Sequence, residues 1–180
     1  MRLNPTKCAF GVASRKFLGF MISQRGIEAN PEKIQAILDM KIPKTIKDIH
    51  SLTRSVATLI RFISKAIDRY APFFKALKGN KRSITWTAEC DKAFSELKEY
   101  MSWTLLLSTP EPGDILTIYL YVSTTTVSSV LIRPYKGAEH PMHYVSKTFQ
   151  DAEVRYPLIE KLAFALVVSA RCLRPYFQAQ

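Results

Sequence analysis

The residues best able to ligate a metal or act as nucleophiles are few and scattered. His140 and His143 form an H-x-x-H pair, but no third ligand lies near them in the sequence. Zinc sites use three or four protein ligands, and strand positions three apart point to opposite faces. Cys8, Cys90 and Cys172 are odd in number and widely separated, which implies no disulfide framework. We therefore expect no metal site and no cofactor for this chain.

The basic residues are more informative, because they are concentrated in the first half of the chain. Residues 1–82 hold 17 Lys and Arg against 5 Asp and Glu, whereas residues 83–180 hold 9 against 10. This asymmetry suggests a polyanion-binding module joined to a more neutral domain. A basic surface that only keeps the protein soluble is the alternative interpretation. The candidate phosphate-binding residues are Lys44, Lys47, Arg54, Arg61 and Lys65.

The basic half must be positioned by a strand pair followed by helices. We expect strands at 8–12 and 17–23, separated by a turn at 14–16, with Gly19 marking a close approach of another backbone. Three helices are expected to follow. The first begins at Asn30-Pro31. The second begins at the capping-box-like segment Thr45–Asp48 and continues to Ile63, and the third runs from Pro72 through Leu77 and ends at Gly79.

The second half changes from helical to strand periodicity. After a polar connector at 80–83, Thr87 caps a further helix, and the segment 110–114 is a strong turn. Strands are expected at 116–122, 127–132 and 142–145. Pro157 then opens a long helix that ends before Pro175, with an apolar face made of Ile159, Leu162, Ala163, Leu166, Val167 and Ala170.

These elements predict an α+β fold: a small strand pair with a helical subdomain, followed by three antiparallel strands and a helix. Three strands and one helix leave a sheet face and a sheet edge uncovered, so the second unit is expected to be incomplete. No run approaches the ~18 apolar residues of a membrane span. Residues 1–5 are not followed by the apolar segment of a signal peptide. We expect an intracellular protein without a membrane partner.

A series of short motifs resembles the Ty3/gypsy class of LTR-retrotransposon Pol polyproteins, in particular those of plants, over essentially the whole chain. Their order and spacing carry the resemblance. The motifs in the first half are Phe17-Leu18-Gly19-Phe20, Ile22-Ser23, Gly26-Ile27, Pro31, Lys33-Ile34, Ile37, Pro43, Ser51-Leu52 and Arg61-Phe62-Ile63. They are followed by Pro72-Phe73-Phe74, Leu77, Trp86, Ala93-Phe94 and Leu97-Lys98.

The resemblance implies four regions and one class of partner. Residues 1–28 would be the end of a reverse transcriptase palm, and 29–82 a thumb-like helical subdomain whose helices follow the template–primer. Residues 83–113 would be a connector helix and turn, and 114–180 a truncated, RNase H-like domain. Within the first region, the residues that match a primer grip are Phe17, Leu18, Gly19 and Phe20. The partner implied is nucleic acid, an RNA–DNA hybrid or template–primer, together with the rest of the Pol polyprotein; apolar packing in a core is the alternative role of these strand residues.

The resemblance also implies that catalytic carboxylates are missing. The family's Tyr-x-Asp-Asp polymerase hairpin would precede Met1. Aligning Ser128–Leu131 with the family's Gly-Ala-Val-Leu places Tyr121 at the first RNase H Asp, and a phenol with a pKa near ~10 is neutral at pH 7. Glu160 matches the second metal-ligand position, although a surface or helix-capping role is the simpler interpretation. The remaining carboxylates would follow Gln180, so the Mg²⁺ of the intact family enzyme is not expected here.

Three functions remain open from the sequence. The leading hypothesis is an inactive piece of a reverse transcriptase/RNase H polyprotein that keeps a template–primer-binding surface. The second is a part of a working Pol polyprotein that contributes to RNA-directed DNA synthesis and hybrid cleavage. The third is a domesticated protein-interaction scaffold built on residues 116–170.

Overall fold

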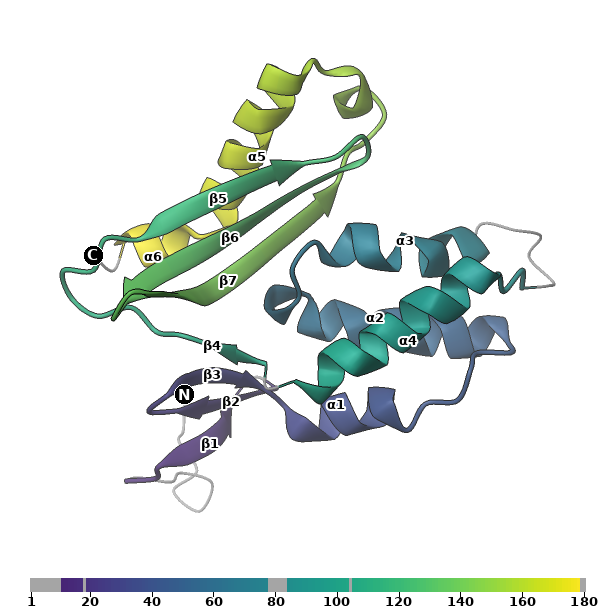
Figure 1. The fold of residues 1–180 in the computed structure, drawn as a ribbon, viewed down its shortest axis with the longest axis horizontal. Coiled ribbons are helices and arrows are strands. Elements are labelled where there is room, and N and C mark those ends of the chain that lie inside the picture. Colours follow the sequence, from purple (N-terminus) through teal and green to yellow (C-terminus); the bar gives the residue numbers. More distant parts are fainter. Residues whose placement is uncertain (1–10, 18, 78–83, 104, 179–180) are drawn as a thin grey trace, which may run out of the picture.

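The computed structural model describes residues 11–17, 19–77, 84–103 and 105–178 (Figure 1). It contains two antiparallel sheets, a group of helices beside the first sheet and a single long helix against the second. The mixed α+β fold predicted from the sequence is therefore confirmed. The strand predicted at 8–12 lies almost entirely outside the described residues.

The first sheet has the strand order β1-β2-β3-β4, and each pair of neighbouring strands is antiparallel. Its strands are β1 (Ser14–Phe17), β2 (Phe20–Ser23), β3 (Gly26–Ala29) and β4 (Leu106–Leu107). The prediction of a turn at 14–16 is wrong, because these residues form β1. The chain instead reverses near Gly19, whose φ of +84° suits a residue without a Cβ atom.

The helical part contains the elements that carry the basic residues. They are α1 (Pro31–Leu38), α2 (Ile46–Leu59), the 3₁₀ turn η2 (Ile60–Phe62), α3 (Ala66–Leu77) and α4 (Ala88–Ser102). Both predicted helix starts are confirmed: Asn30 accepts a hydrogen bond from the Glu32 N–H at 3.0 Å, and Thr45 and Asp48 form a complete capping box. The start predicted at Pro72 is wrong. Pro72 lies inside α3, where burial of the helix's apolar face outweighs the missing N–H.

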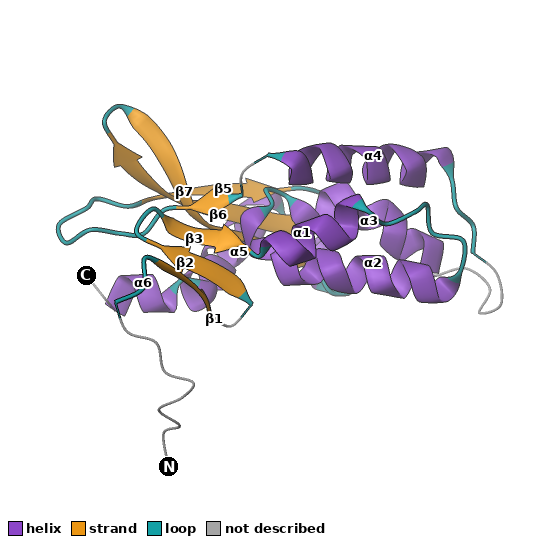
Figure 2. Ribbon diagram, turned by 90° about the horizontal axis from the view of Figure 1, so that it is seen from below, coloured by secondary structure: helices purple, strands orange, loops and turns teal. Residues whose placement is uncertain are grey.

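One apolar core joins all four helices to the first sheet. Each of the four helices and strand β4 contributes a fully buried side chain, namely Ile37, Leu52, Phe73, Leu97 and Leu107. Helix α4 falls in the range expected to be a connector, yet it packs into this core beside α1 and α3 (Figure 2). The Lys98 ammonium ties it further to α1, donating to the carbonyls of Leu38 and Met40, both at 2.7 Å.

The second unit has the predicted three strands and helix. Its elements are β5 (Thr117–Val122), β6 (Thr126–Tyr135), β7 (Ala138–Thr148), the 3₁₀ turn η3 (Glu153–Arg155), α5 (Leu158–Cys172) and the short α6 (Arg174–Gln178). The antiparallel sheet has the order β5-β6-β7. Helix α5 covers one face of this sheet, and the edge strand β7 lies beside the helical part (Figure 1).

The apolar face predicted for α5 is not the face that packs on the sheet. Ala165 and Ser169, each 1% exposed, contact the strands, and the Ser169 hydroxyl donates to the Ser129 hydroxyl at 2.7 Å. Ile159 and Leu166 remain 73% and 51% exposed. The two small residues allow the helix to approach the sheet closely, and this leaves the larger apolar residues outside. None of the helices described is both long and apolar enough to cross a membrane.

Candidate nucleic-acid interface

The exposed side of α2 carries basic residues in a row. Lys47 and Arg54 are both exposed and lie seven residues apart, which places them on one face of the helix about 10 Å apart along its axis. Lys44 precedes the helix and is also exposed. Its backbone N–H donates to the Asp48 carboxylate at 3.1 Å, so the cap of α2 fixes its position. Hydrogen bonds from the Thr45 hydroxyl and from the backbone lower the pKa of Asp48.

Two shallow hollows border this row. The first, of about 370 Å³, lies before and along the start of α2 and is lined by Met40, Lys41, Ile42, Lys44, Asp48 and Ser51. The second, of about 280 Å³, lies between α1 and α2 and is lined by Glu32, Lys33, Ala36, Arg54, Ser55 and Thr58. The Glu32 carboxylate accepts a hydrogen bond from Lys16, which lowers its pKa. The hollows therefore combine lysine and arginine with small hydroxyl side chains, the donors that commonly contact phosphate oxygens.

The hairpin that resembles a primer grip presents its aromatic residues in different ways. Phe17 is 59% exposed, and Leu18 lies outside the described residues. A Cβ atom on Gly19 would lie 2.8 Å from the Lys33 ammonium, so the glycine allows this close contact. Phe20 is half-buried and packs on Phe62, with the ring centroids 5.7 Å apart. Phe17 is therefore available to a ligand, whereas Phe20 mainly supports the core.

Arg61 does not continue the exposed row on α2. Its guanidinium lies 5.0 Å from the Phe20 ring centroid and donates to His143 Nδ1 on β7 at 3.4 Å. Burial, with a smaller contribution from the Arg61 charge, lowers the pKa of His143 to about 4. The imidazole is therefore neutral at pH 7 and accepts this hydrogen bond. The structure places Arg61 at the junction of the two units rather than on the exposed face of α2.

Lys65 also faces the second unit. It has a left-handed backbone (φ 50°), and its ammonium lies 3.4 Å from the centroid of the Tyr121 ring. Three residues later, the Asp68 carboxylate accepts hydrogen bonds from Ser123 (3.2 Å) and Thr126 (2.7 Å). Asp68 was not singled out from the sequence. Its charge could have drawn attention to it, because residues 1–82 contain only 5 acidic residues, of which Asp68 is one, and 17 basic residues.

The two positions that resemble RNase H metal ligands are not brought together. Leu120 and Val122 point towards α5, so Tyr121 lies on the opposite face of the sheet. Glu160 is exposed in the first turn of α5. Within the described part of the chain, no group of three or more His, Cys, Asp or Glu side chains could hold a metal ion. These residues do not fit the two-metal site of the intact family enzyme, and we assign no hydrolytic step to them.

Sequence comparisons relate the chain to retroelement polyproteins. It is 28% identical over 176 residues to the retrovirus-related Pol polyprotein from transposon 297 of Drosophila melanogaster, covering 98% of this chain and 16% of that protein. It is 26% identical over 178 residues to the transposon Tf2-3 polyprotein of Schizosaccharomyces pombe, covering 98% and 13%. The chain therefore spans about a sixth or less of the length of these relatives.

Structure and family comparisons agree on the fold. The foamy viral protease-reverse transcriptase solved with an RNA/DNA hybrid superposes with a TM-score of 0.75 at 22% identity, covering 93% of this chain and 23% of that one. The family of RNase H-like domains found in reverse transcriptase matches residues 86–180, more than half of the chain. The protein thus belongs to the family of RNase H-like domains found in reverse transcriptase.

Proposed function

We propose that this chain binds the RNA–DNA template–primer duplex as part of a Ty3/gypsy-type Pol polyprotein, and that it holds the duplex without cutting it. The observation that carries the proposal is the exposed pair Lys47 and Arg54 on one face of α2, with exposed Lys44 just before the helix. A row of cations on one rigid helix matches the regular charge of a phosphate backbone. Binding would release counterions and so weaken with salt.

The regions inferred from the resemblance form part of the same proposal. Residues 1–28 would act as primer-grip strands with Phe17 at their exposed tip, and 29–82 as a thumb whose α2 contacts the duplex. Residues 83–113 would connect this thumb to the RNase H-like unit, which residues 114–180 would form. The foamy viral reverse transcriptase with a related fold is seen with an RNA/DNA hybrid, which supports the class of ligand.

The proposal gives the RNase H-like unit a structural rather than a hydrolytic role. The side chains at the matched ligand positions are a tyrosine and a glutamate on different sides of the sheet. A two-metal hydrolysis needs several carboxylates that converge on one point. Incubation of the chain with an RNA–DNA hybrid and Mg²⁺ should therefore leave the RNA strand intact, and cleavage abolished by Glu160→Gln would contradict this part of the proposal.

Fluorescence anisotropy with a labelled, blunt-ended RNA–DNA hybrid tests the binding. Affinity should fall steeply as salt rises, and Lys47→Gln/Arg54→Gln should reduce the slope of log K against log salt by about two, one for each lost phosphate contact. The affinity at low salt should fall about tenfold or more.

A matched double variant separates this surface from net charge. Lys92→Gln/Arg171→Gln removes the same charge from exposed positions on α4 and α5, and binding should change much less. Equal losses in both double variants would show non-specific attraction. Absence of binding at low salt by a folded chain would overturn the proposed function.

A further inference from the structure

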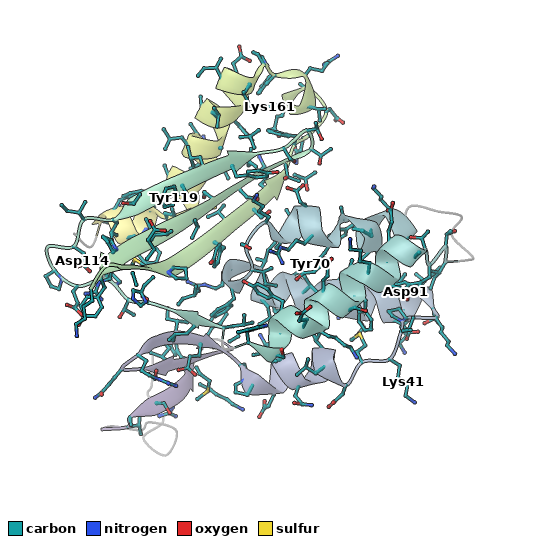
Figure 3. The ribbon with its side chains drawn as sticks, viewed as in Figure 1. Lys41, Tyr70, Asp91, Asp114, Tyr119 and Lys161 are labelled. Atoms are coloured by element: carbon teal, nitrogen blue, oxygen red, sulfur yellow. The ribbon has the colours of Figure 1, made fainter. Side chains whose placement is uncertain are left out.

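A third cavity lies where the two units meet. It has a volume of about 280 Å³ and is open to solvent between the turn after η2 and the sheet face opposite α5. Its lining includes the tyrosines Tyr119, Tyr121 and Tyr144, the lysine Lys65, and the serines Ser64 and Ser128. Figure 3 shows Tyr119 on β5 at this sheet. We call this cavity the tyrosine crevice.

Two of the tyrosines form an exposed aromatic platform. Tyr119 and Tyr121 are two residues apart on β5, so both side chains project from the same face. They are 50% and 41% exposed, although such rings are usually more buried. The Tyr119 hydroxyl donates a hydrogen bond to the Glu139 carboxylate at 2.7 Å. This bond holds the Tyr119 ring in place and raises the pKa of the Tyr119 hydroxyl. A fixed, exposed ring loses little conformational entropy when a flat ligand stacks on it.

A positive charge lines the crevice, and a negative charge lies beside it. The Lys65 ammonium lies over the Tyr121 ring, whereas the Glu139 carboxylate lies beside the Tyr119 hydroxyl. An anionic group on a bound ligand would therefore be attracted to the Lys65 position and repelled from the Glu139 position. This arrangement suits a ligand that is aromatic in one part and anionic in another.

Lys65 has a backbone conformation that is unusual for a residue other than glycine. Its left-handed φ of 50° is a conformation that glycine or asparagine adopts more readily than lysine. The residue starts the turn into α3, since its carbonyl accepts from the Arg69 N–H at 3.1 Å. Glycine would satisfy this turn with less strain. A lysine here is thus better explained by what its ammonium contacts than by the turn itself.

We propose that the tyrosine crevice binds unpaired nucleotides of a single-stranded nucleic acid, with a base stacked on Tyr119, or on Tyr121 once the Lys65 ammonium leaves that ring, and with its phosphate paired with Lys65. Stacking on aromatic rings beside basic residues is how proteins hold single strands without reading their sequence. A duplex would not fit, because its bases are stacked on one another and cannot lie on the rings. The inference deepens the proposed function by adding a site for the strand beyond the duplex.

The test compares three labelled nucleic acids: a blunt RNA–DNA hybrid, the same hybrid with a single-stranded extension, and a free single-stranded oligonucleotide. The wild-type chain should bind the extended hybrid more tightly than the blunt one. Tyr121→Ala should reduce this advantage by about 5- to 150-fold, equivalent to the loss of one stacked base. It should leave blunt-hybrid binding unchanged.

Three further variants keep the result interpretable. Tyr121→Phe retains the ring and should retain the advantage. Tyr135→Ala removes a similarly exposed tyrosine at the far end of β6 and should have no effect. Lys65→Gly relieves the left-handed backbone but removes the Lys65–Tyr121 contact, so the variant should still fold, as circular dichroism would show, while losing affinity for the extension. If Lys65 served only to stabilise the fold, this variant would keep its affinity for the extension.

The outcomes separate the two proposals. If blunt and extended hybrids bind equally well, the crevice is not a nucleotide site, and the duplex surface on α2 stands. If the blunt hybrid fails to bind but the free strand binds in a way that depends on Tyr121, the duplex proposal fails and the crevice stands. If Tyr121→Ala and Tyr135→Ala weaken binding of the extended hybrid equally, the crevice is likewise excluded.

Discussion

The helical part and the RNase H-like unit bury their apolar residues very differently. In the helical part, α1 to α4 and two strands of the first sheet share one continuous core. The RNase H-like unit has two small clusters, one around Leu131 and one around Val127, and its long helix keeps Ile159 and Leu166 exposed. The first region is therefore expected to fold from its own contacts.

The two regions also differ in the side chains that they expose at their surfaces. The helical part keeps its apolar side chains inside and presents cations, a surface suited to phosphate. The RNase H-like unit presents apolar side chains on α5 and tyrosines on the other face of its sheet. Polar contacts centred on Arg61, Lys65 and Asp68 join the two regions. The comparison indicates that the second unit depends on the first for its position.

The largest expected effect comes from breaking the helical core. Leu52→Ala removes a fully buried side chain of α2 and should lower the free energy of unfolding by about 2–5 kcal/mol. Urea denaturation followed by circular dichroism measures this. A loss below about 1 kcal/mol would show that the four helices do not form a tightly packed core.

Acidification should weaken the junction through His143. Its folded pKa of about 4 lies below the ordinary value of 6.5, so the unfolded chain binds the extra proton more readily between these values. The free energy of unfolding is therefore unaffected by protonation of His143 above about pH 6.5, and it decreases as the pH falls from 6.5 towards 4. Partial exposure limits this decrease to about 1–3 kcal/mol. The His143→Gln variant should lose this part of the pH dependence in denaturation curves recorded from pH 7 to 4, and an unchanged slope would contradict the buried, neutral histidine.

A smaller effect is expected from the carboxylate that joins α3 to the second sheet. Asp68→Asn replaces a charged acceptor of two hydroxyl hydrogen bonds and should cost about 1–2 kcal/mol. Hydrogen exchange should show faster opening at residues 123–126 while the helical core stays protected. Asp151→Asn, at an exposed position, is the matched control, and equal changes in both variants would argue against the contact.

The smallest expected effect sharpens the contrast between the two regions. Leu166→Gln on the exposed face of α5 should change the free energy of unfolding by less than about 0.5 kcal/mol, unlike Leu52→Ala. Denaturation of the two variants side by side measures the difference. A loss comparable to that of Leu52→Ala would show that α5 packs with its apolar face inward.

The sequence predicted those helix starts that are fixed by hydrogen bonds between residues close together in the chain. The Asn30 cap and the capping box at Thr45 were identified because their hydrogen bonds join residues two to four positions apart. The start of α3 was mispredicted, because Pro72 usually begins a helix and only tertiary burial allows it inside one. Periodicity identified α5, but the packing of Ala165 and Ser169 against the strands decided which face is inside.

The candidate site was only partly predictable for the same reason. Charge located the basic half, and helical spacing placed Lys47 and Arg54 together. Arg61 and Lys65 follow the same spacing, yet each points to a residue at least 56 positions away, His143 and Tyr121 respectively. Sequence spacing cannot reveal such partners. The tyrosine crevice was missed because its residues come from the η2–α3 turn and from three strands.

The pairing of β4 with β3 has a consequence for synthesis on the ribosome. Gly26–Ala29 cannot complete its sheet until Leu106–Leu107 has been made, and the Leu107 carbonyl lies so close to Gly26 that a Cβ atom there would be only 2.1 Å away. Translating the intervening residues 30–105 takes about 4–15 s at about 5–20 residues per second. During that interval the nascent chain carries an unpaired strand edge. Codon choice across residues 84–107 should therefore affect the yield of folded protein more than codon choice after residue 107.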